Sequence, residues 1–114
     1  MLLTTTSTLD GMRITKYVGI VTGEAILGAN VFKDVFAGIR DIVGGRSATY
    51  EKELQRARDM ALQELESKAQ ALGANAVIGA RYDTTEIATG VTEVLCYGTA
   101  VIVEPANPGE SFRS

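Results

Sequence analysis

Histidine and tryptophan are absent from this 114-residue sequence, and Cys96 is its only cysteine. The missing imidazole removes the usual general base at neutral pH, the commonest metal ligand and every His-based catalytic triad. A single thiol cannot form a disulfide within the chain, so no oxidising compartment is required. The sequence therefore excludes His-dependent catalysis and a fold held by internal disulfides.

Long apolar runs and clustered charges of one sign are also missing. No stretch approaches the roughly 20 apolar residues that cross a bilayer, and the N-terminus lacks the basic and apolar regions of a signal peptide. The 11 basic and 14 acidic residues are interspersed and give a net charge of −3, whereas a nucleic-acid-binding protein normally carries a basic face. We expect a cytoplasmic protein of bacterial type that binds neither nucleic acid nor membrane.

The length of the chain corresponds to one domain. Periodic patterns of apolar residues occupy residues 1–104, which we interpret as one α+β domain. Residues 105–114 contain both prolines of the sequence, Pro105 and Pro108, and show no such pattern. We expect this tail to be disordered.

The strongest local signal predicts a long amphipathic helix from Ser47 to Leu72. Ser47 is a suitable N-cap and Gly73 a suitable C′ residue. Apolar residues recur at helical spacing on one face: Tyr50, Leu54, Ala57, Ala61, Leu65, Ala69 and Leu72. Charged residues crowd the other positions, so we expect the apolar face of the helix to lie on a sheet.

Three segments rich in β-branched and aromatic residues predict strands: Arg13 to Thr22, Ala76 to Ile87 and Val91 to Glu104. Residues 88–90, Ala-Thr-Gly, predict a tight hairpin between the last two strands. The expected fold is a three-stranded antiparallel sheet packed on one long helix. The last strand is apolar on both faces, although a sheet covered by one helix normally exposes a polar face to water.

The stretch from Gly19 to Ser47 is rich in glycine and in large apolar residues, which is unusual for a surface loop. Val31, Val35 and Ile39 fall at helical spacing and predict an extra short helix between the first strand and the long helix. This helix and the second apolar face of the sheet have no partner within one chain. We therefore expect a homo-oligomer that buries both.

Four residues are candidate metal ligands or buried acids: Glu24, Asp34, Asp41 and Cys96. A soft metal prefers thiolates and imidazoles, of which the chain offers one thiol, whereas carboxylates suit Mg²⁺ or Ca²⁺. The alternative is that Cys96 packs in a strand as a small hydrophobe and that the acids cap helices or pair with arginines. Glu24 with Arg40 or Arg46, within or between subunits, is the ion pair we expect first.

The turn formed by Gly44, Gly45, Arg46 and Ser47 is a candidate anion-binding site. Two glycines can turn the backbone amides inward, a helix N-terminus follows, and Arg46 adds a fork of donors. The turn is not a Walker A loop, which follows a strand and ends in Gly-Lys-Ser/Thr. A plain turn between two helices explains the same residues, so both interpretations stay open.

Three segments resemble, in order, those of the YbjQ-like family of small uncharacterised bacterial proteins. They are Val21 to Asn30 (VTGEAILGAN), Phe36 to Ser47 (FAGIRDIVGGRS) and Ala71 to Asp83 (ALGANAVIGARYD). The resemblance extends from Thr5 to about Val103. It implies a dodecin-like α+β subunit, assembly as a homopentamer, and a label of heavy-metal binding that names no established activity.

The dodecin-like resemblance also makes Tyr17, Tyr82 and Tyr97 candidates to line a pocket for a planar ligand, although strand tyrosines also pack at sheet faces. The sequence contains no GxSxG nucleophile, Cys-His pair, metalloprotease helix or dinucleotide-binding fingerprint. We interpret the protein as a non-enzymatic homo-oligomer that binds a small ligand or a metal ion at subunit interfaces. A purely structural or partner-binding ring without a ligand is the alternative, and an unrecognised enzyme comes third.

Overall fold

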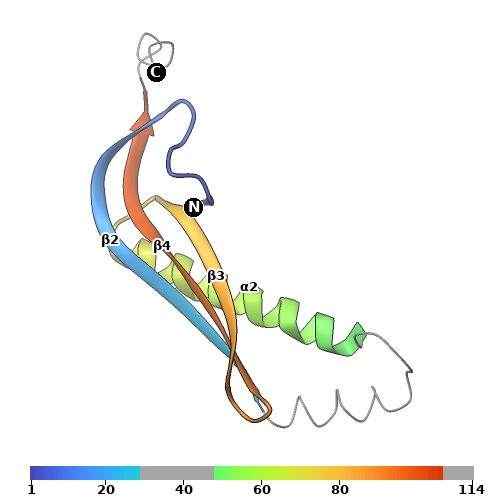
Figure 1. Cartoon of the computed structure of the whole chain (residues 1–114). Helices are drawn as coiled ribbons and strands as arrows, with labels where there is room; N and C mark the ends of the chain where they lie inside the picture. Colours follow the sequence, from blue (N-terminus) through green and yellow to red (C-terminus); the bar gives the residue numbers. More distant parts are fainter. Residues whose placement is uncertain (29–47, 107–114) are drawn as a thin grey trace.

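The computed structural model describes residues 1–28 and 48–106, which form four strands and one helix (Figure 1). The elements are β1 (Leu2–Leu3), β2 (Met12–Leu27), α2 (Ala48–Ala71), β3 (Ala76–Ala88) and β4 (Val91–Pro105). The short helix predicted around Val31 to Ile39 and most of the predicted tail lie outside the described residues. Along the described parts, the fold is α+β.

The sheet has four strands in the order β1-β3-β4-β2, and β4 lies between its two antiparallel partners. The predicted three-stranded antiparallel sheet is therefore wrong in one respect, because β1 adds a fourth strand parallel to β3. Leu2 pairs with Ala76 and Leu3 with Val77. Two residues are too few to show an alternating pattern, and their pairing depends on a partner more than 70 positions away.

The first predicted strand is longer than its sequence pattern suggested. Instead of ending near Thr22, β2 continues through Gly23 to Leu27, in unbroken register with β4 from Ile20 opposite Thr99 to Leu27 opposite Thr92. Gly23 does not end the strand. Its missing side chain lets α2 approach the backbone of β2, since a Cβ atom on Gly23 would lie 1.9 Å from the carbonyl oxygen of Ala61.

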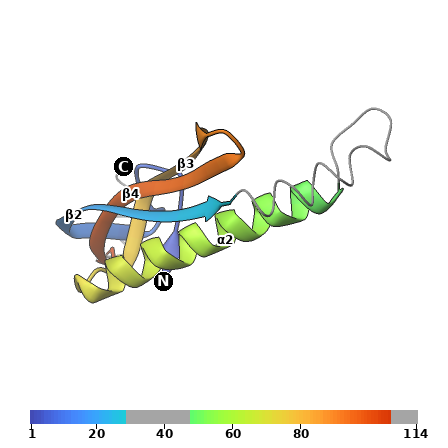
Figure 2. The same ribbon diagram turned by 90° about the horizontal axis from the view of Figure 1, so that it is seen from below.

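The amphipathic character predicted for the long helix is confirmed, because α2 lies along one face of the sheet (Figure 2). Its buried residues recur every three or four positions: Leu54, Ala57, Ala61, Leu65 and Ala69. They pack against Val21, Ala25, Val94 and Cys96 on the sheet, and alternation along β2 and β4 sends these side chains to the same face. Leu72, which the pattern placed on the buried face, is 56% exposed.

A second and smaller core lies on the opposite face of the sheet. It contains Ala76, Ile78, Val101 and Val103, against which Leu9 and Ile14 pack. The consecutive residues Ala100 and Val101 of β4 are both 0% exposed. Ala100 belongs to the core beneath α2 and Val101 to the second core, so β4 is buried on both faces at this point. The chain between β1 and β2 therefore covers part of the second apolar face that the sequence predicted. Farther along β2 toward Leu27, on the same face, Ile20 and Ile26 are 81% and 57% exposed.

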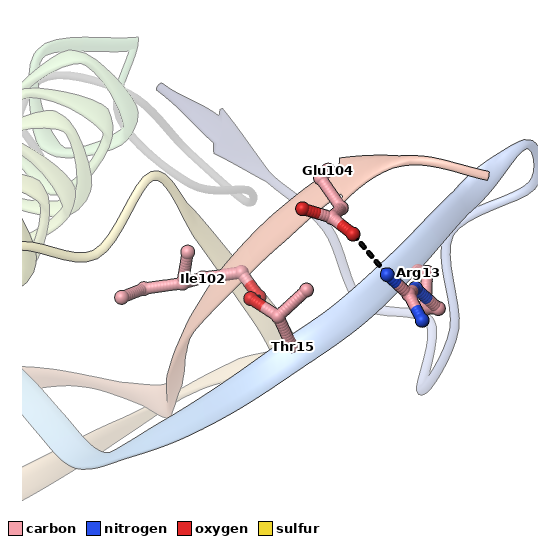
Figure 3. Close-up of polar contacts among 4 residues, drawn as sticks. All are labelled: Arg13, Thr15, Ile102 and Glu104. Atoms are coloured by element: carbon pink, nitrogen blue, oxygen red, sulfur yellow. Dashed lines mark hydrogen bonds and ion pairs between the residues drawn. The ribbon is translucent and has the colours of Figure 1, made fainter.

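Polar side chains hold the start of β2 to the end of β4 (Figure 3). Arg13 and Glu104, which are opposite one another in register, form an ion pair on the surface. The pairing shifts between Ile14 and Lys16, and Thr15 at this bulge donates a hydrogen bond of 3.2 Å from its Oγ1 to the carbonyl oxygen of Ile102. The hydroxyl thus binds a backbone group of β4 where the ladder is irregular.

Candidate functional site

A cleft of about 430 Å³ lies where the N-terminal segment, α2 and β3 meet. Seven residues line it: Leu3, Thr4, Thr5, Leu62, Ala80, Arg81 and Tyr82. This volume falls within the range of about 300–1,000 Å³ that is usual for small-molecule sites. The walls combine aliphatic side chains, hydroxyl groups, one aromatic ring and one guanidinium group.

The cleft forms where the N-terminal segment leaves β3. After the two residues of β1, the chain follows β3 through hydrogen bonds from Thr4 N to Val77 O (2.9 Å), Gly79 N to Thr6 O (2.8 Å) and Ala80 N to Thr4 O (2.9 Å). Gly79 has a φ of 61°, a left-handed conformation that favours glycine, and the β3–β4 register shifts between Ile78 and Arg81. The bulge bends β3 away, and the cleft opens beside it.

Hydroxyl groups stiffen the N-terminal wall of the cleft. The Oγ1 atoms of Thr4 and Thr6 lie 2.8 Å apart, and Thr6 Oγ1 donates to the carbonyl oxygen of Thr8 at 2.6 Å. Thr6 N also donates to Thr4 Oγ1 at 3.2 Å. These local bonds replace a regular ladder in a segment too short to form one, and they fix the backbone that carries Thr5.

Arg81 spans from β3 to this N-terminal wall. Its Nη1 donates to the carbonyl oxygens of Thr5 (3.0 Å) and Ala80 (2.9 Å). Among the described residues no carboxylate pairs with Arg81, so its positive charge is held in place by neutral acceptors. A fixed guanidinium group of this kind retains free donors for a ligand.

Tyr82 forms another wall, and the guanidinium carbon of Arg58 lies 5.3 Å from the centroid of its ring. Arg58 is partly buried on α2, one helical turn before the lining residue Leu62. Its Nε atom is buried and has no hydrogen-bond partner within the described parts of the chain. The next turn of the same row carries Glu66, whose Oε1 lies 3.7 Å from the amino group of Met1. Side chains four residues apart share one helix face, so Arg58 and Glu66 flank Leu62, which lines the cleft.

Cys96 lies in β4 with 0% exposure, on the face that α2 covers. Burial raises the pKa of its thiol. This placement agrees with the interpretation of Cys96 as a small hydrophobe in the core. The proposed thiol ligand is thus directed into the helix–sheet core of its own chain.

Glu24 lies within β2, on the face away from α2, and is exposed. Leu95 is its partner across the sheet, and Asp83 pairs with Leu95 on the other side. The predicted partners Arg40 and Arg46 lie outside the described residues. So do the candidate acids Asp34 and Asp41 and the whole predicted anion turn: Gly44, Gly45, Arg46 and Ser47.

The donor set of the described residues does not fit a heavy-metal site within one chain. No group of three or more Cys, Asp or Glu residues that could hold a metal ion occurs in residues 1–28 and 48–106. The whole chain has no imidazole, and its one thiol is buried in the core. In the same described parts, no helix combines the length and apolar character needed to cross a membrane.

One long helix on a four-stranded mixed sheet, with a cleft at the parallel edge, defines a small α+β protein. The chain belongs to the YbjQ family, whose family model matches residues 1–104 and is described as "Putative heavy-metal-binding". The family predicted from the three sequence segments is thus confirmed.

A solved structure supports the same fold. This chain is similar to a protein of unknown function of the DUF74 family from Pediococcus pentosaceus ATCC 25745, with a TM-score of 0.58 and 22% sequence identity. The match covers 91% of this chain and 98% of that chain. At this identity the likeness shows the fold alone.

The residues of the cleft were mostly absent from the sequence-based candidates. Of the three tyrosines considered there, Tyr82 lines the cleft, whereas Tyr17 is 67% exposed on β2. Leucine, threonine and arginine form no motif that predicts a site. The one local signal is Gly79, which marks the bend in β3, and the contact between the N-terminal segment and β3 is visible only in the folded chain.

Proposed function

We propose that this protein is a homo-oligomeric binding module that holds a small ligand in the cleft between the N-terminal segment, α2 and β3. The observation that carries the proposal is the cleft itself, with Arg81 fixed across it by two backbone acceptors. Leu3, Leu62 and Ala80 supply apolar walls, and Thr4 and Thr5 supply polar groups. Ligand sites commonly combine a mostly apolar wall with a few fixed polar groups.

The residues that line the cleft support binding rather than catalysis. They include no carboxylate, thiol or imidazole, so Tyr82 carries the one side chain of this lining that could serve in acid–base catalysis, and no second group stands beside it to activate a nucleophile. The hydroxyls of Thr4 and Thr6 contact one another, which occupies them structurally. We therefore propose a non-enzymatic role.

Oligomerisation is the second part of the proposal. On the sheet face away from α2, Ile20 and Ile26 are 81% and 57% exposed, and they flank the exposed Glu24 on β2. Exposed large apolar side chains on a single face are typical of an interface. We propose that another copy of the chain covers this face, in the pentamer that the family resemblance implies, and that the assembly is cytoplasmic.

A closed ring would also place the ligand site at a subunit interface. In such a ring each subunit uses two different surfaces, one for each neighbour. The exposed side chains lie on β2 at one edge of the sheet, and the cleft lies at the β1–β3 edge. We propose that the next subunit borders the cleft. Light scattering on the purified protein tests assembly, and a monodisperse monomer at micromolar concentration would refute it.

Native mass spectrometry and metabolite extraction of the purified protein test ligand binding. Leu62→Trp fills the cleft from α2, and Met60→Trp, at an exposed position of the same helix, is the matched control. We expect a bound small molecule in the unchanged protein and in Met60→Trp, and its loss in Leu62→Trp with the assembly intact. An intact ring that binds no small molecule would favour the structural alternative.

Metal binding follows from the description of the family and is tested separately. Native mass spectrometry with Zn²⁺, Cu⁺ and Ni²⁺ should give the same loading for the unchanged protein and for Cys96→Ser, because the thiol is buried in the core. Loading that is lost in Cys96→Ser would make this thiol a ligand and contradict the cleft as the principal site.

A further inference from the structure

Two guanidinium groups close to Tyr82 pair with no carboxylate among the described residues. Arg81 precedes it on β3 and binds only the backbone oxygens of Thr5 and Ala80 among the described residues. Arg58 contacts the Tyr82 ring from α2 and forms no ion pair with any residue of the described ranges. By contrast, Arg56 on the same helix forms a surface salt bridge with the carboxylate of Glu53.

The guanidinium group of Arg58 carries a buried Nε–H. Its nitrogen is inaccessible to solvent and has no acceptor within the described parts of the chain. A buried donor is costly when it lacks a partner, and nearly all such groups in folded proteins are satisfied. The chain itself covers this Nε atom, so a ligand would reach Arg58 through the terminal amino groups of its guanidinium, whose geometry and charge suit a phosphate or carboxylate oxygen.

The position of Arg58 on α2, next to the Tyr82 ring, indicates where that oxyanion would lie. Arg58, Leu62 and Glu66 follow one another at intervals of one turn, and Leu62 lines the cleft. Glu66 has its own partner in the Met1 amino group, so the carboxylate at the far end of the row is compensated. Among the described residues, Arg58 thus brings a positive charge without a carboxylate partner to the Tyr82 wall, and Arg81 brings a second one to the N-terminal wall at Thr5.

We infer that the ligand of this cleft carries an oxyanion, phosphate or carboxylate, which binds at the Tyr82 end between Arg58 and Arg81. Its apolar part lies along Leu3, Leu62 and Ala80. This inference rests on the proposed function, because it specifies the chemistry of the same cleft. It does not involve the glycine turn at residues 44–47, which the sequence suggested as an anion site.

Isothermal titration of the full-length oligomer with three aromatic probes tests the inference. Phenyl phosphate and benzoate are the anionic probes, and phenol is the neutral one. We expect each anion to bind about tenfold or more tightly than phenol, since charge-assisted hydrogen bonds are the strong ones. The better of the two anions identifies the headgroup class. Inorganic phosphate should compete with phenyl phosphate on the unchanged protein, which requires no mutation.

Three arginine variants locate the site. Arg58→Met and Arg81→Met should each weaken binding of the better anion about tenfold or more and leave phenol binding nearly unchanged. Arg56→Met, at a 71% exposed side chain of the same helix, should leave both unchanged. Circular dichroism and light scattering check that each variant is folded and assembled.

The outcomes separate the two proposals. Phenol bound as tightly as the anions, or a neutral molecule found in the native cleft, overturns the oxyanion inference and leaves the binding function standing. Anion binding that survives both Arg58→Met and Arg81→Met also overturns it. Binding of no probe, with no copurified small molecule, overturns the oxyanion inference and the proposed function together.

Discussion

Gly23 of β2 and Ala61 of α2 are in backbone contact. A Cβ atom built on Gly23 would lie 1.9 Å from the Ala61 carbonyl oxygen and 2.7 Å from the nitrogen of Leu65. Both atoms belong to the helix backbone, so a rotamer change cannot relieve the clash. The glycine therefore sets the distance between helix and sheet over the centre of the larger core.

Replacing Gly23 with alanine should push α2 away from β2. We expect Gly23→Ala to lower the free energy of unfolding by about 3 kcal/mol, the upper end of ordinary overpacking, because backbone must move. Gly28→Ala is the matched control, since no atom of residues 1–28 and 48–106 lies within 4 Å of a Cβ atom at Gly28. Urea denaturation at fixed protein concentration measures both. Equal midpoints for the two variants would contradict the contact.

Asn75 continues the pairing of β3 with β4 through its side chain. Its Nδ2 donates to the carbonyl oxygen of Val103 at 2.9 Å, and Val103 N donates to its Oδ1 at 2.8 Å. We expect Asn75→Ala to cost about 1–2 kcal/mol, because two backbone groups of β4 lose their partner. Gln55→Ala, which removes one exposed bond to Asp59 on α2, should cost less than about 0.5 kcal/mol. Similar losses in both variants would show that the Asn75 pair adds nothing beyond a surface bond.

The buried thiol of Cys96 should make stability depend on alkaline pH. Burial raises the pKa of Cys96 in the folded state. Above the ordinary thiol pKa of about 8.5 the unfolded chain loses this proton while the folded chain keeps it, so folding weakens as pH rises. The contribution is fully present below that pH and is lost toward the raised folded pKa. Between about pH 7 and about pH 10, the unchanged protein should lose more unfolding free energy than Cys96→Ala.

The same burial predicts slow thiol labelling. A disulfide reagent added to the folded protein should react with Cys96 only as fast as the protein opens, and immediately in denaturant. Rapid labelling at neutral pH without unfolding would contradict the placement of the thiol beneath α2.

Glu64 and Lys68 form an i,i+4 ion pair on the exposed side of α2, with Lys68 Nζ 3.0 Å from Glu64 Oε1. The hydrogen bond from Lys68 is the main cause that lowers the pKa of Glu64, and the Glu24 backbone N–H adds to it. The stabilisation is present above the ordinary glutamate pKa of about 4.3 and is lost as pH falls through the lowered value. NMR titration should show the Glu64 pKa rising in Lys68→Met. An unchanged titration midpoint would mean that the pair does not persist in solution.

The sequence predicted the elements with strong local patterns. The long helix follows from apolar residues spaced as Leu54, Ala61 and Leu65 are, and the hairpin follows from two β-rich segments around Gly90. The Glu64–Lys68 ion pair likewise follows from the i,i+4 spacing of the two residues on α2. Such features depend on residues near in sequence, which is why a single sequence suffices to find them.

The features that escaped prediction depend on distant contacts. Leu2 and Leu3 are a strand only because β3 lies beside them. The cleft combines residues 3–5, 62 and 80–82, which share no motif. Arg58 looked like one more charge on a solvated helix face, and its significance comes from Tyr82, which lies 24 positions further along the chain.

The position of β4 has a consequence for the nascent chain. β2 pairs with β4 and with no other strand among the described residues, yet more than 60 residues separate the two in synthesis. While the ribosome is making α2 and β3, the 16-residue β2 therefore has no strand partner. The apolar face of α2 meanwhile lacks its contacts with the buried residues of β4. Contacts between such distant segments form slowly and leave strand edges exposed. Release of residues 91–105 from the exit tunnel is the event that allows both cores to close, so the exposed intermediate is the stage at which chaperones would engage this protein.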